Sequence, residues 1–170
     1  ILTDDAHGRA RIEEVPGDAL GAAMDLGEIA VVPGFQGVTT GGRITTLGRG
    51  GSDTSAVAVA AALNCPCDIY TDVDGVYTTD PRVESRARRL AKVSYEEMLE
   101  MASLGAKVLQ TRSVEMAMHN RVPVRVLSSF IEPDENGILP EDAGTLICDE
   151  DEIVEKRIVS GVTMSRDEAR

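Results

Sequence analysis

The chain has 170 residues, 42% of them apolar and 27% charged, a composition typical of one soluble globular domain. Its 17 basic and 29 acidic residues give a formal charge of −12, which repels nucleic acid and anionic lipid, so neither is an expected partner. The longest apolar stretch, Ala56–Leu63, is far too short to cross a membrane, and no signal-peptide pattern opens the chain, so we expect a cytoplasmic protein.

The first part of the chain predicts two strands and a helix. Arg9–Val15 is a weak strand signal that Pro16-Gly17 closes, and Ala19–Leu26 has apolar residues at helical spacing with Gly27 as a C-terminal cap. Ile29–Val32 is a continuous apolar run, typical of a strand that is buried on both faces of a parallel sheet. We therefore expect functional residues just beyond this run.

A glycine-rich loop then leads into a helix. Seven glycines lie between positions 34 and 51, interrupted by Ile44–Leu47, which indicates a loop with a small hairpin. Ser52 and Asp53 offer capping oxygens to a helix over Thr54–Leu63. Because this helix is apolar all round, we expect it to be buried against a sheet.

The rest of the chain continues the alternation of strands and helices. Asp68–Val73 predicts a second buried strand, so the order strand, helix, strand is typical of a parallel sheet. Ser94 and Glu97 form a capping box for a helix that reaches Leu104 and ends at Gly105. The other expected elements are a surface loop at 77–89, a helix at 106–120, a strand at 123–127, an acidic loop at 132–142 and a strand at 145–148.

The cysteines and histidines do not predict a metal site. Cys65 and Cys67 are separated by one residue, which is neither zinc-knuckle nor redox-pair spacing, so we expect buried or incidental thiols. His7 and His119 lie far apart in the sequence.

The first candidate site is the segment Gly48–Asp53, at the start of the predicted helix. Backbone N–H groups there can converge on an anion at the positive end of the helix dipole, although a flexible helix entry would have the same glycines. Arg49 favours the functional reading, since a guanidinium between glycines can pair with a carboxylate or phosphate.

The second candidate site is Thr71–Arg82, which begins at the carboxyl end of a predicted strand, where open α/β sheets bind ligands. Asp74-Gly75 by itself is typical of a turn. The loop also combines a ring, a cation and two carboxylates, which favours a nucleotide: Asp72, Tyr77, Asp80 and Arg82.

The third candidate is Gly105–Val108. Lys107 falls in the first turn of a predicted helix, where a cation is disfavoured unless an anion shares the site; a solvated lysine is the alternative.

Together the segments 48–53, 71–82 and 105–109 resemble the successive signatures of the aspartate kinases, within the amino acid kinase family. The similarity is close over 33–148, and 155–170 resembles the linker and opening strand of an ACT-type regulatory domain. The resemblance implies an α/β fold, part of a three-layer αβα sandwich with a mostly parallel sheet. It also implies a division into residues 1–148, the C-terminal part of the kinase domain, and 149–170.

The activity that the resemblance implies is phosphoryl transfer from MgATP to the side-chain carboxylate of L-aspartate, giving 4-phospho-L-aspartate on the way to lysine, threonine and methionine. Arg49 would hold a carboxylate of aspartate beside Gly50, Gly51 and Ser52, and Asp53 would orient the catalytic lysine. Mg²⁺ would be bound through the nucleotide, with no metal-binding residue of the chain. The nucleotide would contact Thr71, Asp72, Tyr77, Asp80, Arg82, Lys107 and Val108.

The family's N-terminal Lys-Phe-Gly-Gly-Thr-Ser motif, which carries the catalytic lysine, has no counterpart in this sequence. The chain opens at Ile1 without methionine, so we expect an excerpt that is inactive alone. In the complete protein the resemblance implies a dimer and an amino-acid feedback inhibitor bound by regulatory domains absent here. Two alternatives stay open: a nucleotide-binding module without catalysis, and another amino acid kinase.

Overall fold

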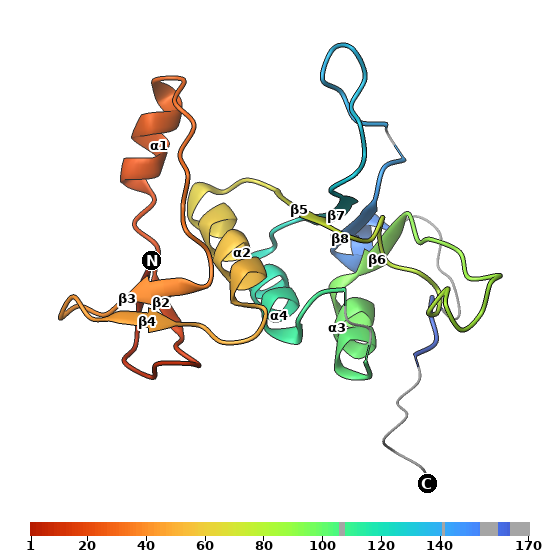
Figure 1. Cartoon of the computed structure of the whole chain (residues 1–170), viewed down its shortest axis with the longest axis horizontal. Coiled ribbons are helices and arrows are strands. Elements are labelled where there is room, and N and C mark those ends of the chain that lie inside the picture. The colour runs from red at the N-terminus through yellow and green to blue at the C-terminus, as the bar shows by residue number, and fades with distance from the viewer. Residues whose placement is uncertain (106–107, 141, 154–159, 164–170) are drawn as a thin grey trace, which may run out of the picture.

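The structure is a computed structural model that describes residues 1–105, 108–140, 142–153 and 160–163. These residues form two four-stranded sheets, which lie apart with helices between them (Figure 1). The first sheet has the order β2-β1-β3-β4, with β1 at Leu2–Thr3, β2 at Ile12–Glu14, β3 at Gln36–Val38 and β4 at Ile44–Thr46. The second has the order β5-β7-β8-β6, with β5 at Cys67–Thr71, β6 at Lys92–Ser94, β7 at Val124–Ser128 and β8 at Thr145–Cys148. The helices are α1 at Asp18–Asp25, α2 at Gly51–Leu63, α3 at Tyr95–Ser103, α4 at Thr111–Asn120 and the 3₁₀ turn η1 at Glu150–Glu152.

The strand pairing confirms the predicted α/β class and adds more antiparallel pairs than expected. Three pairs are parallel, namely β1 with β3, β5 with β7 and β6 with β8. Three are antiparallel, namely β1 with β2, β3 with β4 and β7 with β8. In the described part of the chain the sheets are therefore mixed rather than mostly parallel.

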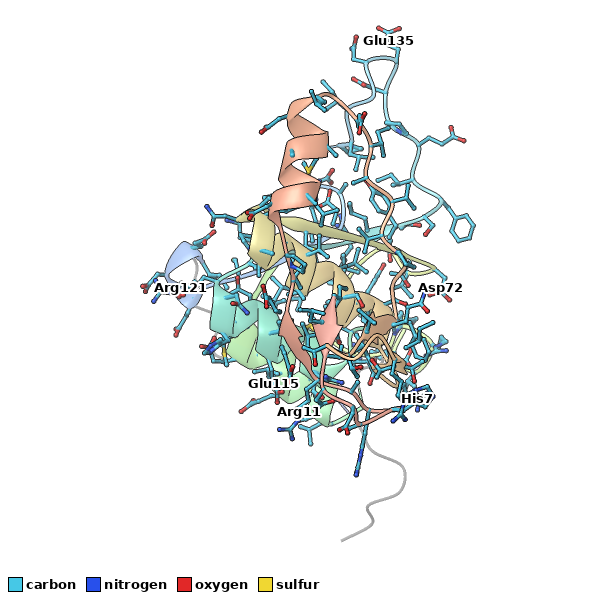
Figure 2. All side chains as sticks on the ribbon, turned by 90° about the vertical axis from the view of Figure 1, so that its left-hand side faces the viewer. His7, Arg11, Asp72, Glu115, Arg121 and Glu135 are labelled. Carbon is cyan, nitrogen blue, oxygen red and sulfur yellow. The ribbon has the colours of Figure 1, made fainter. Side chains whose placement is uncertain are left out.

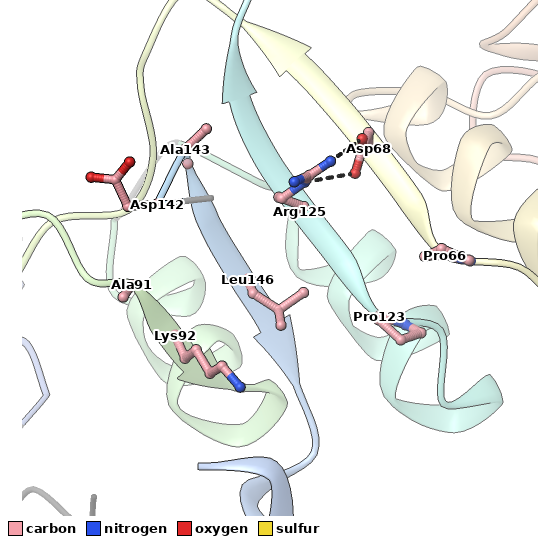
Figure 3. Close-up of a pocket in the computed structure, with 10 residues that line it drawn as sticks. Pro66, Asp68, Ala91, Lys92, Pro123, Arg125, Asp142, Ala143 and Leu146 are labelled. Carbon is pink, nitrogen blue, oxygen red and sulfur yellow. Dashed lines mark hydrogen bonds and ion pairs between the residues drawn. The ribbon is translucent and has the colours of Figure 1, made fainter. Parts of the chain in front are cut away.

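Helices cover one face of the second sheet. Figure 1 shows α2, α4 and α3 lined up along that face, and their apolar side chains meet those of the strands in one core. The opposite face carries the Asp68–Arg125 ion pair, at 2.7 Å, with Lys92 and Leu146 along a shallow hollow (Figure 3). Two of the three expected layers are thus seen in the described residues. Fully buried members of the core include Val57, Val93, Met98, Val114, Val124, Val126 and Ile147.

Short connections fix the direction of α2 and α4. The first turns into β5 through Asn64–Pro66 and the second into β7 through Arg121–Pro123, and the two strands are parallel. Each helix therefore runs antiparallel to the strand that follows it, and both helix N-termini lie at the carboxyl end of the two parallel strands. Asn64 and Arg121 make the reversals by adopting left-handed φ values of 50° and 52°.

Several predicted elements are confirmed with shifted ends. The weak strand, the first helix and the hairpin appear as β2, α1 and β3-β4, with Gly27 at a φ of 76° after α1. The predicted helix at 106–120 begins at Thr111, and residues 106–107 lie outside the described part. Pattern reasoning missed β6, which is only three residues long.

The strand prediction for Ile29–Val32 is wrong for this chain. The run has no regular secondary structure, and the exposed fractions of Ile29 and Val31 are 92% and 89%. Among the described residues no strand pairs with it, so these apolar residues are not part of a sheet. Helix α2 is likewise buried on one side only, since Ala56 and Ala62 are exposed.

The cysteine prediction is confirmed for the thiols of Cys67 and Cys148, which are buried and free. Burial, with smaller contributions from nearby acidic groups, raises the pKa of Cys67 to about 11, so this thiol is unreactive at neutral pH. Cys65 is free and partly buried. None of the described helices has the length and apolar character needed to cross a membrane.

The predicted linker begins with η1. Of the residues beyond it, Ile153 and Ser160–Thr163 are described, and the N–H of Val162 donates to the carbonyl of Thr78 at 2.7 Å. The strand expected for a regulatory domain falls mainly on 154–159 and 164–170, outside the described residues.

The capping box of α3 generates a stability prediction. Ser94 Oγ accepts from the N–H of Glu97 at 3.2 Å, and Glu97 Oε2 accepts from the N–H of Ser94 at 3.1 Å. Ser94→Ala removes the first bond at a buried helix start, so we expect a loss of about 1–2 kcal/mol in the free energy of unfolding. Urea denaturation measures it. Ser103→Ala, at the exposed end of the same helix, is the control and should change stability by less than about 0.5 kcal/mol.

Candidate functional site

The glycine loop before α2 is built on two left-handed backbone positions. Gly48 and Gly50 have φ values of 83° and 70°, and Gly50 is the N-cap residue of α2. No side chain caps this helix, so the capping role predicted for Ser52 and Asp53 is wrong. The cap position is a glycine, which has no side chain that could accept from the N–H groups at the helix start.

Close packing requires both glycines. A Cβ atom at Gly50 would lie 2.0 Å from Cγ of Gln110, and one at Gly48 would lie 2.6 Å from the carbonyl oxygen of Gly8. The contact with Gln110 brings the first and third predicted segments together, since Val108 lies two residues before it. Lys107 lies outside the described residues.

Arg112, which sequence reasoning missed, holds the base of the loop. Its Nη1 donates to the carbonyl of Leu47 at 2.9 Å and its Nη2 to the carbonyl of Ala10 at 2.5 Å. These bonds join the start of α4 to the strand end before Gly48 and to the N-terminal segment. A cation in the first turn of a helix is unfavourable by itself. The position of Arg112 in the sequence was therefore the signal that could have identified it as a functional residue.

The loop presents donors to an anion. The N–H of Gly51 is already used, since it donates to the carbonyl of Gly48 at 3.0 Å. No described residue accepts from the N–H groups of Gly50, Ser52 and Asp53, and the side chain of Arg49 is exposed. A small anion at the mouth of α2 would therefore meet three amides and a guanidinium.

Asp53 is half-buried in the first turn of α2. Loss of solvent raises the pKa of its carboxyl group above the ordinary value of 3.8. A desolvated carboxylate beside a loop with free N–H groups is typical of a functional position.

Phe35 is a second residue that sequence reasoning missed. Its φ of 71° is unusual for a bulky residue and marks local strain. The ring lies against Gly51, where a Cβ atom would approach Cδ2 to 3.0 Å, and the Phe35 N–H donates to Ser55 Oγ at 3.2 Å. Phe35 therefore forms one wall of the loop.

The second predicted segment is an ordered loop with paired polar groups. Thr71 Oγ1 donates to Asp72 Oδ1 at 3.2 Å at the end of β5. Tyr77 donates its hydroxyl proton to Asp74 Oδ2 at 3.0 Å, and this bond raises the pKa of Tyr77.

Farther along this loop, Asp80 and Arg82 form a two-point ion pair. Both of its side-chain hydrogen bonds measure 3.1 Å. Arg82 is exposed, so its cation can reorient toward an incoming phosphate.

Thr145 of β8 fixes this loop from below. Its Oγ1 accepts from the N–H of Val76 at 2.8 Å and donates to the carbonyl of Leu90 at 2.6 Å, and the residue is fully buried. Gly75 has no room for a side chain, because a Cβ atom there would lie 2.5 Å from Thr145 Oγ1. The pairing of Tyr77 with Arg89 closes the loop.

Both loops lie at the carboxyl end of the second sheet. Figure 2 shows Asp72 on the same side of the molecule as the N-terminal end of α2, as the short link from α2 to β5 requires. Two hollows of about 580 and 710 Å³ lie elsewhere, on the open sheet face and around Arg11 and Arg112, and neither is lined by a predicted site residue. The described residues contain no group of three or more acidic, His or Cys side chains that could hold a metal ion.

Comparison with known proteins shows which family has this arrangement. The model of the amino acid kinase family matches residues 1–128. The chain belongs to the amino acid kinase family. An aspartate kinase from Pseudomonas putida is 57% identical over 172 residues, which cover the whole chain and 40% of that relative. This member of the family thus spans less than half the length of the curated relatives it matches.

Solved structures agree with this membership. Aspartokinase III of Escherichia coli in complex with aspartate and ADP superposes with a TM-score of 0.69 at 42% identity, covering 87% of this chain and 32% of that one. The same enzyme in complex with lysine and aspartate gives a TM-score of 0.67 at 41% identity, covering 88% and 33%. The amino acid kinase fold is therefore shared over most of the described chain.

Thr145→Val tests the anchoring of the second loop. Valine has a similar shape but leaves the buried N–H of Val76 without an acceptor, so we expect a loss of about 1–3 kcal/mol in the free energy of unfolding by urea. The control Thr40→Val changes an exposed threonine in the β3-β4 turn and should be nearly neutral. Equal stability of the two variants would contradict the anchoring role.

Asp53→Asn tests the desolvated carboxyl group. Because its folded-state pKa is raised, the native state binds the proton more tightly than the unfolded state, and stability falls as pH rises past 3.8 and through the folded pKa. The amide cannot ionise, so the variant should have the higher melting temperature at pH 7, and the gain should shrink as pH falls toward 3.8. Melting curves across this range measure it, with the exposed Asp5→Asn as control.

Proposed function

We propose that this chain is the nucleotide-side part of an aspartate kinase, which transfers the γ-phosphoryl group of ATP to the side-chain carboxylate of L-aspartate. The observation that carries the proposal is the loop at Gly48–Asp53, with free N–H groups and exposed Arg49, at the same end of the sheet as the loop Thr71–Arg82. The aspartate and ADP named for the E. coli structure and the names of the relatives support it.

Arg49 is the residue we assign to the substrate. Its guanidinium would pair with a carboxylate of aspartate, and the N–H groups of Gly50 and Ser52 would add two donors. Gly51 would not donate to the substrate, because its N–H already donates to Gly48. Its role would be to leave room for Phe35, which a side chain at this position would contact. The substrate would thus be held by charge and by backbone geometry.

The nucleotide is assigned to the second and third segments. Asp72 and Tyr77 would contact the base and ribose side, and Arg82 would leave Asp80 to meet phosphate oxygens. The remaining residues proposed for the nucleotide are Thr71, Asp80, Lys107 and Val108. Because Val108 is close to Gln110, which packs on Gly50, nucleotide and amino acid would meet over one part of the surface.

The chemistry needs charge neutralisation rather than a covalent enzyme nucleophile. Two anions must be brought in line, so fixed cations and amide donors at the mouth of α2 lower the barrier. Mg²⁺, carried by the nucleotide phosphates, supplies further positive charge when bound. Asp53 would orient the catalytic lysine contributed by the rest of the kinase domain.

We also make three proposals about the whole protein, on its location, its assembly and its regulation. We place it in the cytoplasm, as a dimer regulated by an amino acid that binds beyond residue 149. The lysine named for one E. coli structure is consistent with such an inhibitor. The chain by itself would bind nucleotide without turnover, since it spans 40% of the P. putida relative.

The test joins this chain to the remaining kinase segment of the P. putida relative and measures aspartyl phosphate as its hydroxamate. Arg49→Ala should lower kcat/KM for aspartate by about 100-fold, which corresponds to about 2–3 kcal/mol for a charge-assisted pair, while the KM for ATP stays within a few-fold. Arg43→Ala, an exposed arginine in the β3-β4 turn, is the matched control.

Two outcomes would count against the assignment. An unchanged kcat/KM for Arg49→Ala would remove the substrate role of this residue. Nucleotide binding by the joined protein, seen by calorimetry with ADP, but no phosphorylation of aspartate would favour a binding module or another substrate.

A further inference from the structure

Arg112 lies in the first turn of α4, where a positive charge is unfavourable for the helix. The N-terminal end of a helix carries a partial positive charge, α4 has no acidic residue in its first turn, and no described side chain caps it. The stability of α4 therefore does not explain this cation. Its hydrogen-bond partners lie outside the helix and are two main-chain carbonyls, those of Leu47 and Ala10.

The two carbonyls belong to segments that are far from α4 in the sequence but bonded to each other. Leu47 directly precedes Gly48, the first residue of the glycine loop, and Ala10 is fully buried and donates its N–H to the carbonyl of Thr46 at 3.0 Å. Nη1 of Arg112 lies 2.9 Å from the first carbonyl oxygen and Nη2 lies 2.5 Å from the second. Because a guanidinium is planar and rigid, these two bonds fix both the distance and the direction from α4 to the start of the loop.

The same end of α4 contacts the loop a second time, at Gly50. Gln110, the N-cap residue of α4, packs there so closely that a Cβ atom on Gly50 would lie 2.0 Å from its Cγ. The carbonyl of Gln110 accepts from the N–H of Ser113 at 3.0 Å and from Ser113 Oγ at 2.8 Å, which fixes Gln110 to the helix. On the other side, the carbonyl of Gly50 accepts from the N–H of Thr54 at 3.1 Å. The start of α4 therefore holds the glycine loop at two points, Leu47 and Gly50.

We propose that Arg112 is a positioning residue for phosphoryl transfer, which sets the spacing between the bound amino acid and the bound nucleotide. The inference rests on the proposed function, which assigns the amino acid to Gly48–Asp53 and the nucleotide in part to Val108, two residues before Gln110. Leu109 between them is buried in the core, so Val108 is held in place with α4. Arg112 is partly buried and both its Nη atoms are bonded to the protein, so it would touch neither substrate.

Such a residue affects the rate of the chemical step more than the binding of either substrate. If α4 shifted against the glycine loop, each substrate would still meet its own groups, but the attacking carboxylate and the γ-phosphorus would no longer be aligned. A misplacement of about 1 Å can slow a reaction by about 100-fold. The alternative is a purely electrostatic effect of the Arg112 cation on the phosphates. A lysine would supply the same charge, but it cannot hold two carbonyls in a fixed geometry.

The experiment uses the joined protein of the preceding subsection and measures kcat and both KM values, with each variant assayed well below its melting temperature. Arg112→Lys and Arg112→Met should each lower kcat by at least about tenfold, while the KM values for aspartate and ATP change by less than about threefold. Arg11→Lys and Arg11→Met are the matched controls and should leave kcat unchanged. Arg11 lines the same hollow as Arg112, but it is exposed and its side chain makes no hydrogen bond with the described residues.

Hydrogen exchange in this chain alone tests the same contact without a substrate. The N–H of Gly51 is bonded to the carbonyl of Gly48 within the loop that Arg112 holds. It should exchange at least about threefold faster in Arg112→Lys and Arg112→Met than in the unchanged chain, because the loop opens more often once its start is released. Arg11→Lys should leave this rate unchanged.

Four outcomes would overturn the proposal. Full kcat in Arg112→Lys, with a loss only in Arg112→Met, would assign a charge effect. A lower melting temperature with unchanged kcat would assign a purely structural role, and a rise in KM alone would assign substrate binding. Unchanged exchange at Gly51 would show that Arg112 does not hold the loop. Because that exchange needs no substrate, faster exchange in a protein that does not phosphorylate aspartate would contradict only the proposed function.

Discussion

The parallel pairing of β5 with β7 sets the direction of the elements around it. A short link joins α2 to β5 and another joins α4 to β7. Both helices therefore run antiparallel to these two strands and begin at the carboxyl end of the strands. The loop after β5 starts at the same end. Residues that lie far apart in the chain, such as Gly50 and Gln110, are therefore brought into contact by the direction of the strands rather than by local preference.

Within this frame, small residues and buried polar groups set the shape of the two loops. Gly48 and Gly50 allow backbone approaches that any side chain would block, and Arg112 ties the loop to α4 through main-chain carbonyls. Thr145 does the same for the second loop from β8. The supporting residue is partly buried in the first loop (Arg112) and fully buried in the second (Thr145), while residues proposed to meet ligands, such as Arg49 and Arg82, face solvent.

The chain also has two surfaces that none of its described elements covers. The apolar run at Ile29–Val32 has free main-chain groups, and one face of the second sheet holds the Asp68–Arg125 pair along an open hollow. Both features fit a polypeptide that spans 40% of its relatives and yet retains a well-packed core between the second sheet and α2–α4. That core is local to β5–β8 and their helices, so it forms from contacts within this part of the chain.

Sequence patterns were most informative where the determining interaction is local. The capping box at Ser94 and Glu97, the left-handed position at Gly27 and the strands at β5, β7 and β8 depend on nearby residues or on a short apolar pattern, and the structure confirms them. The resemblance to a kinase rested on three ordered motifs, and the comparisons show the family. The Ile29–Val32 pattern predicted a strand, but a strand needs a partner that pattern alone cannot provide.

What the sequence by itself determined was the α/β class and the family, together with the segments that we propose to carry the site. Only the tertiary structure decided that Gly51 has no free amide, that Phe35 and Arg112 shape the glycine loop, and that Asp80 pairs with Arg82. The physical reason is that hydrogen-bond partners and buried surroundings come from residues distant in the chain. Residue type and spacing list the possible donors and acceptors, and the packing of α4, β4 and β8 against the loops selects among them.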